Sequence, residues 1–395
     1  MQKLTIIIAL IFSGNLLVAQ YNDSISIQLT KEIKEFANEN QFVGFSVAIY
    51  NENEILYNKG FGYSDKSQKK EYTKNTIQNI GSTSKTFIAL ALLKAQELGV
   101  LHLDDSINKH LPFKVFNPYF PKEIITIRQL TSHTSSIRDR DWWYGLNCYI
   151  LKEGKTKNQK KSIGVSKPNK MMSMETLYKN YLVKGGGFYK KKSFSKYKPG
   201  THYEYSNIAA ALGAYILEQA TGQDFRDFTQ KYIFNPLEMN DTGWSFDDVP
   251  MEKHTHLYTK SHKELALYSL VTYPDGGLIT SASDMAKYSI ELLKGSQGNG
   301  ELLSVESYEE AYTQVLNENH FNGELKENSG VFFDIRTNGE IGHGGSDPGV
   351  STLLYYNPKT KTGSYLQINT GVNKKSVPQL LFIWKKLKEY EVFFN

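Results

Sequence analysis

The sequence predicts an α/β fold of the α+β type, in which one antiparallel sheet is built from both chain ends and flanked by helices. Strand patterns lie near the start of the chain, at residues 42–57, and near its end, at 340–368. The short linkers between the later strands favour antiparallel hairpins. Between the two strand-rich ends the patterns are mostly helical. We therefore expect a mostly helical region, at about residues 100–270, inserted into a single sheet.

The individual elements follow from the spacing of apolar residues. Residues 82–98 form the most apolar helical pattern in the chain and end at Gly99, so they predict a buried helix. Apolar runs bounded by polar turns predict strands, and apolar residues three or four apart predict helices. The other predicted helices are 24–38, 208–219 and 377–394, and the predicted strands are 42–50, 55–57, 340–346, 350–356 and 364–368.

Composition excludes several classes of protein. The 395 residues suit two or three domains, or one large α/β unit with an insertion. The 26 Tyr, 21 Phe and 4 Trp exclude a disordered or coiled-coil chain. A single cysteine, Cys148, excludes a disulfide scaffold and a cysteine-rich zinc module. The net charge of +5 is too small to argue for a nucleic-acid partner.

Residues 1–20 predict a secretory signal peptide. A short positive start at Met1–Lys3 precedes an apolar run at 4–12, and cleavage is expected near Ala19 or Gln20. The alternative, a membrane anchor, needs a longer uninterrupted apolar run. No later segment is apolar enough to cross a membrane. We expect the mature chain, residues 21–395, to be exported to the periplasm or the extracellular space.

A basic segment interrupts the insertion at residues 152–198. It holds 14 Lys against two Glu, a net charge of +12 within a chain of net +5. Two interpretations stay open. The segment is either a solvated loop, or a patch that binds an anionic polymer of the cell envelope.

Ser82 and Lys85 open the most apolar helix and share one of its faces, since they are three residues apart. A serine needs a base to become a nucleophile, and a lysine can serve if apolar surroundings lower its pKa. Backbone amides at the helix start can stabilise an oxyanion. Serine is also a common N-cap, and only context distinguishes this S-x-x-K pattern. The pattern begins at Ser67, Ser82, Ser106, Ser193 and Ser195.

A second candidate motif, Tyr205-Ser206-Asn207, precedes the apolar helix 208–219. In an extended loop the phenol of Tyr205 and the amide of Asn207 point the same way. A phenol near a lysine can move a proton, and an amide can bind the amide of a substrate. The same spacing occurs at Tyr178 and at Tyr355, so this motif is also modest by itself.

Taken in order, these motifs resemble those of the serine β-lactamase and penicillin-binding superfamily, in the branch of class C β-lactamases, D-alanyl-D-alanine carboxypeptidases and related esterases. The resemblance implies a β-lactamase/transpeptidase-like fold and one serine hydrolase domain over residues 21–395. It also implies an acyl-enzyme, with Ser82, Lys85 and Tyr205 as catalytic residues and no metal or cofactor. Further similar segments are 127–136, 235–243 and 275–285.

The third motif of this family has two candidates. Lys361-Thr362-Gly363 has the residues that are more common in this motif, but it follows a turn signal. His343-Gly344-Gly345 lies on a predicted strand, where glycines let a substrate approach the backbone. We prefer the second. By resemblance, Asn207, His343, Gly345 and Ser346 bind substrate, and the N–H groups of Ser82 and Ser346 form the oxyanion hole. Because His343 carries charge only when protonated, the motif argues against an efficient β-lactamase.

Rival chemistries lack their signatures. There is no G-x-S-x-G elbow, and His254, His256 and His262 lack an H-E-x-x-H pattern. Residues 142–144, Trp-Trp-Tyr, either line the cleft or pack the helical region. The sequence thus predicts an exported serine hydrolase of a small peptide or ester substrate, of the D-alanyl-peptidase or esterase type. The alternatives are a class C-like β-lactamase, or a non-catalytic protein that recognises penicillin or an envelope polymer.

Overall fold

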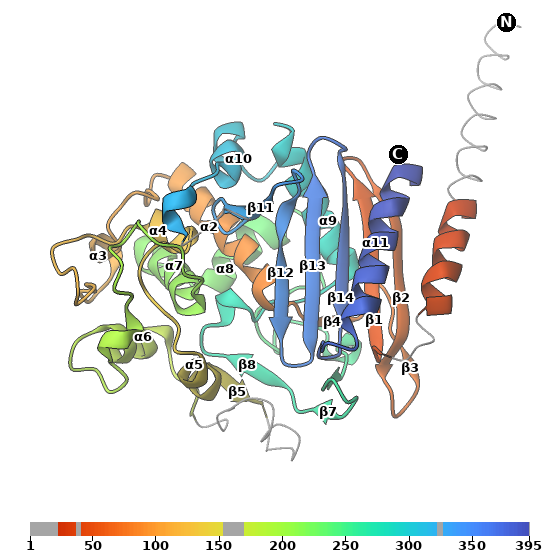
Figure 1. Ribbon diagram of the computed structural model, residues 1–395, viewed down its shortest axis with the longest axis horizontal. Coiled ribbons are helices and arrows are strands. Elements are labelled where there is room, and N and C mark those ends of the chain that lie inside the picture. The colour runs from red at the N-terminus through yellow and green to blue at the C-terminus, as the bar shows by residue number, and fades with distance from the viewer. Residues whose placement is uncertain (1–22, 37–40, 153–169, 322–326, 395) are drawn as a thin grey trace, which may run out of the picture.

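The structure is a computed structural model, and it describes residues 23–36, 41–152, 170–321 and 327–394 (Figure 1). The predicted signal peptide and residues 153–169 of the basic segment, with five of its 14 lysines, lie outside these residues. In the described part of the basic segment, Lys179 pairs with Glu175, and Lys198 lies 2.9 Å from Glu123. No helix in these ranges combines the length and the apolar character needed to cross a bilayer.

One eight-stranded antiparallel sheet joins the two ends of the chain, which confirms the predicted fold class (Figure 1). Strand β1 lies between β14 and β2, so the first strand of the chain pairs with the last. In sheet order the strands are β10 (Glu327–Ser329), β11 (Asp334–Arg336), β12 (Ile341–Asp347), β13 (Val350–Asn357), β14 (Thr362–Ile368), β1 (Gly44–Asn51), β2 (Ile55–Asp65) and β3 (Lys70–Glu71).

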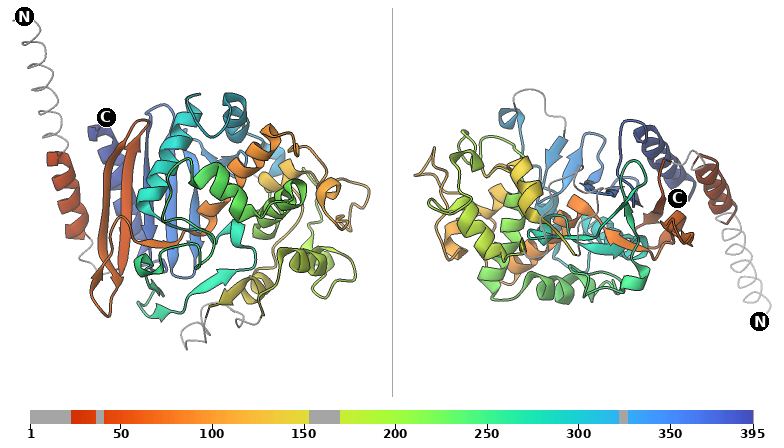
Figure 2. Two further views of the ribbon diagram at one scale, coloured as in Figure 1. Left: turned by 180° about the vertical axis from the view of Figure 1, so that it is seen from behind. Right: turned by 90° about the horizontal axis from the view of Figure 1, so that it is seen from below.

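Both faces of the sheet are covered by helices, since apolar side chains of β1 point to both faces. Phe45, Val47 and Ile49 belong to a core shared with the helix at 23–36 and with α11 (Val377–Phe394). Ala48 and Tyr50 belong to the larger core on the other face, where α9 (Ala282–Ser296) packs. Side chains of one strand point alternately to opposite faces, so each face has its own apolar set. Figure 2 shows the helices on both sides of the sheet.

The predicted helix at 82–98 has two parts. A 3₁₀ turn, η1 (Gly81–Ser84), leads into α2 (Lys85–Glu97), whose residues 85–93 are all buried. This burial agrees with a helix that is apolar on all faces. Around it lie the other helices of the helical region, which are α3 (Ile107–His110), α4 (Ile127–Thr131), α5 (Asp141–Cys148), α6 (Met174–Leu182), α7 (Asn207–Thr221) and α8 (Phe225–Thr229).

The insertion is less uniformly helical than the sequence suggested. Short strands of two or three residues, too short to show a period in the sequence, pair within it. These strands are β5 (Tyr149–Leu151) with β8 (Tyr268–Leu270), and β6 (Leu257–Tyr258) with β7 (Glu264–Leu265). At its borders β4 (Ile77–Asn79) pairs with β9 (Ile279–Ser281).

Strand β12 packs directly on the turn η1, and a glycine makes this approach possible. A Cβ atom on Gly345 would lie 2.1 Å from the Ile80 carbonyl oxygen and 2.3 Å from the Thr352 hydroxyl. That hydroxyl donates to the Ile80 carbonyl at 2.7 Å and lies 2.8 Å from the hydroxyl of Thr83. The absent side chain of Gly345 therefore serves the packing that fixes η1 against the sheet.

We expect Gly345→Ala to lower the free energy of unfolding by about 1–3 kcal/mol, since the added methyl must displace backbone atoms. Denaturant titration measures this change. Gly344→Ala is the matched control, because its methyl would meet no atom nearer than 3.7 Å. Equal stability of the two variants would contradict the packing argument.

Candidate active site

Ser82 lies in η1 and lines a cavity of about 220 Å³. The residue before Ser82 is Gly81, whose φ of +56° is a left-handed conformation that favours glycine. A Cβ on Gly81 would lie 2.9 Å from the Ser346 nitrogen. The turn therefore brings the candidate nucleophile next to the backbone of β12, where Ser346 lines the same cavity.

Lys85 is fully buried and connects three elements through its ammonium group. Its Nζ donates to Ser82 Oγ at 3.0 Å and to Asn207 Oδ1 at 2.8 Å. A third hydrogen bond, of 2.7 Å, goes to the backbone oxygen of Asp275, in the 3₁₀ turn η7 (Tyr273–Asp275). An ammonium has three N–H donors, and all three are used. The expected contact between Ser82 and Lys85 is present in the structure.

The lowered pKa that Lys85 would need in order to act as the base is not found. Burial does act in that direction, but the acidic groups of Tyr205, Asp275 and Asp347 outweigh it and raise the pKa above its ordinary value. Lys85 is therefore an ammonium in the resting site. In that state it donates to Ser82, and it cannot take the proton of that hydroxyl.

Tyr205 is the remaining neighbour of Ser82 that can accept its proton, and it can do so only as the phenolate. The residue is 38% exposed, and the Lys85 Nζ lies 5.1 Å from the centroid of its ring. Burial of the phenol raises the pKa of Tyr205, and contacts with Lys85 and Ser82 oppose that rise. His133 packs against the ring at 4.3 Å between centroids. Burial and the charge of Lys85 lower the pKa of His133, so this neighbour is neutral.

Asn207 begins helix α7 and faces Lys85. Because its Oδ1 accepts from Lys85, only its amide N–H₂ is left for a substrate. Asp139, which belongs to none of the sequence motifs, holds this helix start. Its carboxylate accepts from Ser206 Oγ at 2.8 Å and from the N–H groups of Asn207 and Ile208 at 2.7 and 2.9 Å. No local pattern links Asp139 to a helix that starts so far along the chain.

His343 lies on β12 beside Tyr205, with 6.3 Å between ring centroids. It is buried, and burial lowers its pKa, so the imidazole carries no charge near neutral pH. Its Nδ1 lies 2.6 Å from the Gly344 carbonyl oxygen. His343 therefore contributes shape and a neutral surface next to Tyr205.

Lys361-Thr362-Gly363 lies far from Ser82. Gly363 pairs with Tyr356 at the far end of β13, whereas Ser346 pairs with Ser351 near its start. Five residues of strand separate the two pairs by roughly 17 Å. Lys361 forms an ion pair of 3.1 Å with Glu52 instead. Of the two candidate third motifs, the geometry brings only the one on β12 to the nucleophile.

The far wall of the cavity comes from α5 and the segments around it. Tyr144 lines the cavity, and its hydroxyl lies 2.8 and 2.9 Å from the two carboxyl oxygens of Asp275. Trp142 is 80% exposed, and Trp143 packs on Tyr181 at 4.5 Å between centroids. Of the three aromatic residues at 142–144, therefore, only Tyr144 lines this cavity.

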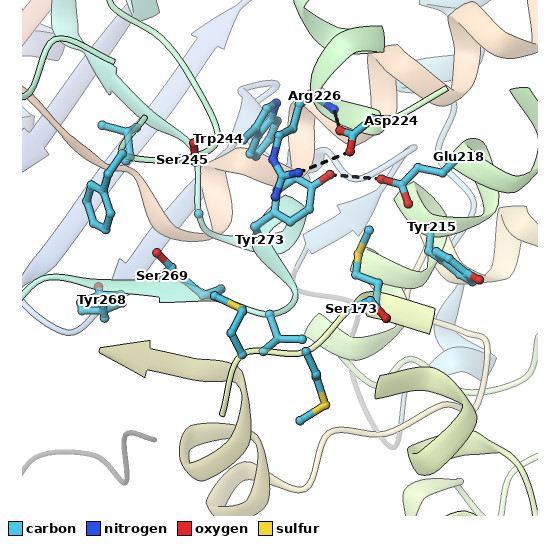
Figure 3. A pocket seen from close by; sticks show the side chains of 18 of the residues that line it. Ser173, Tyr215, Glu218, Asp224, Arg226, Trp244, Ser245, Tyr268, Ser269 and Tyr273 are labelled. Carbon is cyan, nitrogen blue, oxygen red and sulfur yellow. Dashed lines mark hydrogen bonds and ion pairs between the residues drawn. The ribbon is translucent and has the colours of Figure 1, made fainter. Parts of the chain in front are cut away.

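Tyr273, in the turn η7, lines a second cavity, of about 410 Å³ (Figure 3). There the Arg226 guanidinium lies 4.2 Å from the Tyr273 ring centroid, and the Tyr273 hydroxyl donates to Glu218 at 3.2 Å. Burial raises the pKa of Glu218 to about 6. The two cavities share no lining residue. This network fixes the turn whose carbonyl accepts from Lys85.

The three histidines considered as metal ligands have separate partners. His254 contacts the Thr255 carbonyl, His256 contacts Glu264, and His262 contacts the Gln41 carbonyl. Among the residues that the structure describes, no group of three or more His, Cys, Asp or Glu side chains could hold a metal ion.

The sequence is similar to that of known proteins. A curated relative, Penicillin-binding protein 4* from Bacillus subtilis (strain 168), is 27% identical over 334 residues, which are 79% of this chain. The chain spans only 65% of that relative's length.

Two solved structures share the fold. The D-alanine carboxypeptidase AmpC from Burkholderia cenocepacia has a TM-score of 0.67 at 19% identity, with 93% of this chain and 99% of that chain covered. EstCE1, described as a hydrolase with promiscuous acyltransferase activity, has a TM-score of 0.65 at 17% identity, covering 95% and 99%.

The family model described as Beta-lactamase matches residues 29–159 and 188–385. These ranges include most of the sheet, the turn with Ser82, the segment of Tyr205 and the strand of His343. The resemblance read from the sequence motifs is thereby confirmed. Because the match covers most of the chain, this protein belongs to the Beta-lactamase family and has the serine hydrolase fold of β-lactamases and penicillin-binding proteins.

Proposed function

We propose that this protein is an exported hydrolase that cleaves an ester or peptide bond through an acyl-enzyme on Ser82. The observation that carries the proposal is the 3.0 Å contact between Lys85 Nζ and Ser82 Oγ, with Tyr205 beside both. The carboxypeptidase and hydrolase named among the structural neighbours support this reaction class.

In this mechanism Tyr205 first releases its proton to solvent, and Ser82 Oγ then attacks the substrate carbonyl as the serine proton passes to the Tyr205 phenolate. The ammonium of Lys85 stabilises the phenolate that receives this proton, since opposite charges at short range favour each other. The N–H groups of Ser82 and Ser346 hold the oxyanion. Tyr205 then gives the proton to the leaving group, which departs as the acyl-enzyme forms. Water repeats the sequence and releases the acid.

Replacement of the nucleophile tests the proposal directly. Ser82→Ala should lower kcat by about three orders of magnitude or more, because no other group can form the acyl bond. The measurement is turnover of p-nitrophenyl esters, a D-alanyl-D-alanine peptide and nitrocefin. Intact-mass spectrometry should detect the acyl adduct only in the parent protein.

Ser106→Ala is the matched control, since Ser106 opens another S-x-x-K pattern but caps the short helix α3. Near-full turnover by Ser82→Ala would refute the mechanism. Long-lived labelling by a penicillin with no ester hydrolysis would instead support a non-catalytic penicillin-recognising protein. Fast hydrolysis of nitrocefin alone would support a β-lactamase.

The third motif has its own test. We expect His343→Ala to lower kcat/KM by at least about tenfold, because a cavity beside Tyr205 lets the phenol move from its position. Lys361→Ala should change kcat/KM by less than about twofold, since it removes only an exposed ion pair. Steady-state kinetics on one ester compares the two variants. The reverse result would place the third motif on the hairpin between β13 and β14.

Export is proposed from the apolar segment at residues 4–12 and the small residues that follow it. When the full gene is expressed with its own leader in a bacterial host, N-terminal sequencing of the extracytoplasmic protein should begin at or just after residue 20. Recovery of uncleaved protein in the cytoplasm would contradict export. Binding of an anionic polymer by the basic segment stays a prediction.

A further inference from the structure

The cavity above Ser82 is lined by acidic groups. Four of the residues that line it are aspartates, and no Lys, Arg or His lies among the described residues that line it. The nearest cation, Lys85, has its three N–H groups directed at protein acceptors. His343 beside the cavity is neutral. A carboxylate on a substrate would therefore find no counter-charge here, whereas a cation would find several. The carboxyl groups belong to Asp139, Asp141, Asp275 and Asp347.

Three of the four carboxyl groups either accept hydrogen bonds from the protein or are exposed to solvent. Asp139 accepts hydrogen bonds from the start of α7, and Asp275 accepts from Tyr144. Asp141 is exposed at the edge of the cavity. These groups create a negative field, but each has a role without a ligand.

Asp347 differs from the other three. It follows Ser346 directly on β12, and one of its oxygens, Oδ1, accepts from the Tyr149 hydroxyl. The other oxygen, Oδ2, is buried and has no hydrogen-bond donor among the residues that the structure describes. It lies over Gly276, where an added Cβ would be 3.0 Å away, and both residues line the cavity.

A buried carboxylate oxygen without a donor is costly, so the site lacks a partner that a ligand can supply. Lys85 is not that partner, since its donors reach Ser82, Asn207 and Asp275 instead. Burial raises the pKa of Asp347 to about 6, and an approaching cation would favour its charged form. A protonated amine offers both the charge and the N–H donor that this oxygen lacks.

Resting on the proposed hydrolase function, we infer that the enzyme selects substrates that carry a protonated amine next to the scissile ester or amide bond, and that Asp347 binds this amine. The field of the other carboxyl groups adds to the selection. Substrates with a carboxylate at the same place are disfavoured. The inferred class therefore consists of amino-acyl amides and esters, or esters of amino alcohols.

Matched substrate pairs test this inference. Alanine p-nitroanilide, as both enantiomers, is compared with isobutyric p-nitroanilide, in which a methyl replaces the ammonium on the acyl side. On the leaving-group side, 2-(dimethylamino)ethyl acetate is compared with 3-methylbutyl acetate. We expect the amine member of at least one pair to have a kcat/KM about tenfold or more higher at pH 7, on the scale of a charged hydrogen bond.

The variant Asp347→Asn should reduce that amine-to-neutral ratio by at least about fivefold, because the amide keeps the shape and loses the charge. Asp141→Asn, in the same cavity but exposed, should reduce the ratio by less than about twofold, since water screens its charge. The ratio is the readout because any general damage to the site affects both substrates of a pair.

The outcomes separate the inference from the proposed function. Ser82-dependent hydrolysis with no amine preference in either pair would overturn the inference and leave the hydrolase intact. Equal loss of preference in the two aspartate variants would overturn the assignment to Asp347. No Ser82-dependent hydrolysis of any substrate would overturn the proposed function itself.

Discussion

The hydrogen bonds of one buried ammonium group hold the site together. Lys85 Nζ binds a side chain from η1, a side chain from α7 and a backbone carbonyl from η7. A buried charge must be satisfied to be tolerated, so these three elements cannot move apart without a large cost. The geometry of the site therefore follows from the hydrogen bonds that satisfy the ammonium of Lys85. The same three acceptors also hold the ammonium in its position.

Glycines set the second constraint, by allowing backbones to approach where no side chain fits. Gly345 lets β12 reach the turn η1, and Gly81 gives that turn its left-handed start. Together they bring Ser346 beside Ser82, although the two residues belong to opposite ends of the chain. The sheet topology, in which β1 pairs with β14, makes this meeting possible.

Burial sets the charge of the ionisable groups in and beside the cavity. Both histidines near Tyr205 are neutral because they are buried close to Lys85. The carboxyl groups of Asp275 and Asp347, by contrast, have pKa values raised by burial to about 7 and about 6. The groups around the ammonium of Lys85 are thus neutral or negatively charged. This charge distribution arises from the folded arrangement and not from any single motif.

Apolar periodicity and short motifs are local, so they were enough to predict the sheet built from both ends, the buried helix after Ser82 and the grouping of Ser82, Lys85 and Tyr205. A turn signal is local too, and it favoured His343 over Lys361. The protonation of Lys85, the support of α7 by Asp139 and the Asp347 oxygen without a donor could be found only in the folded chain. Each of these depends on groups that are far apart in sequence, and a pKa or a missing hydrogen bond is a property of neighbours in space.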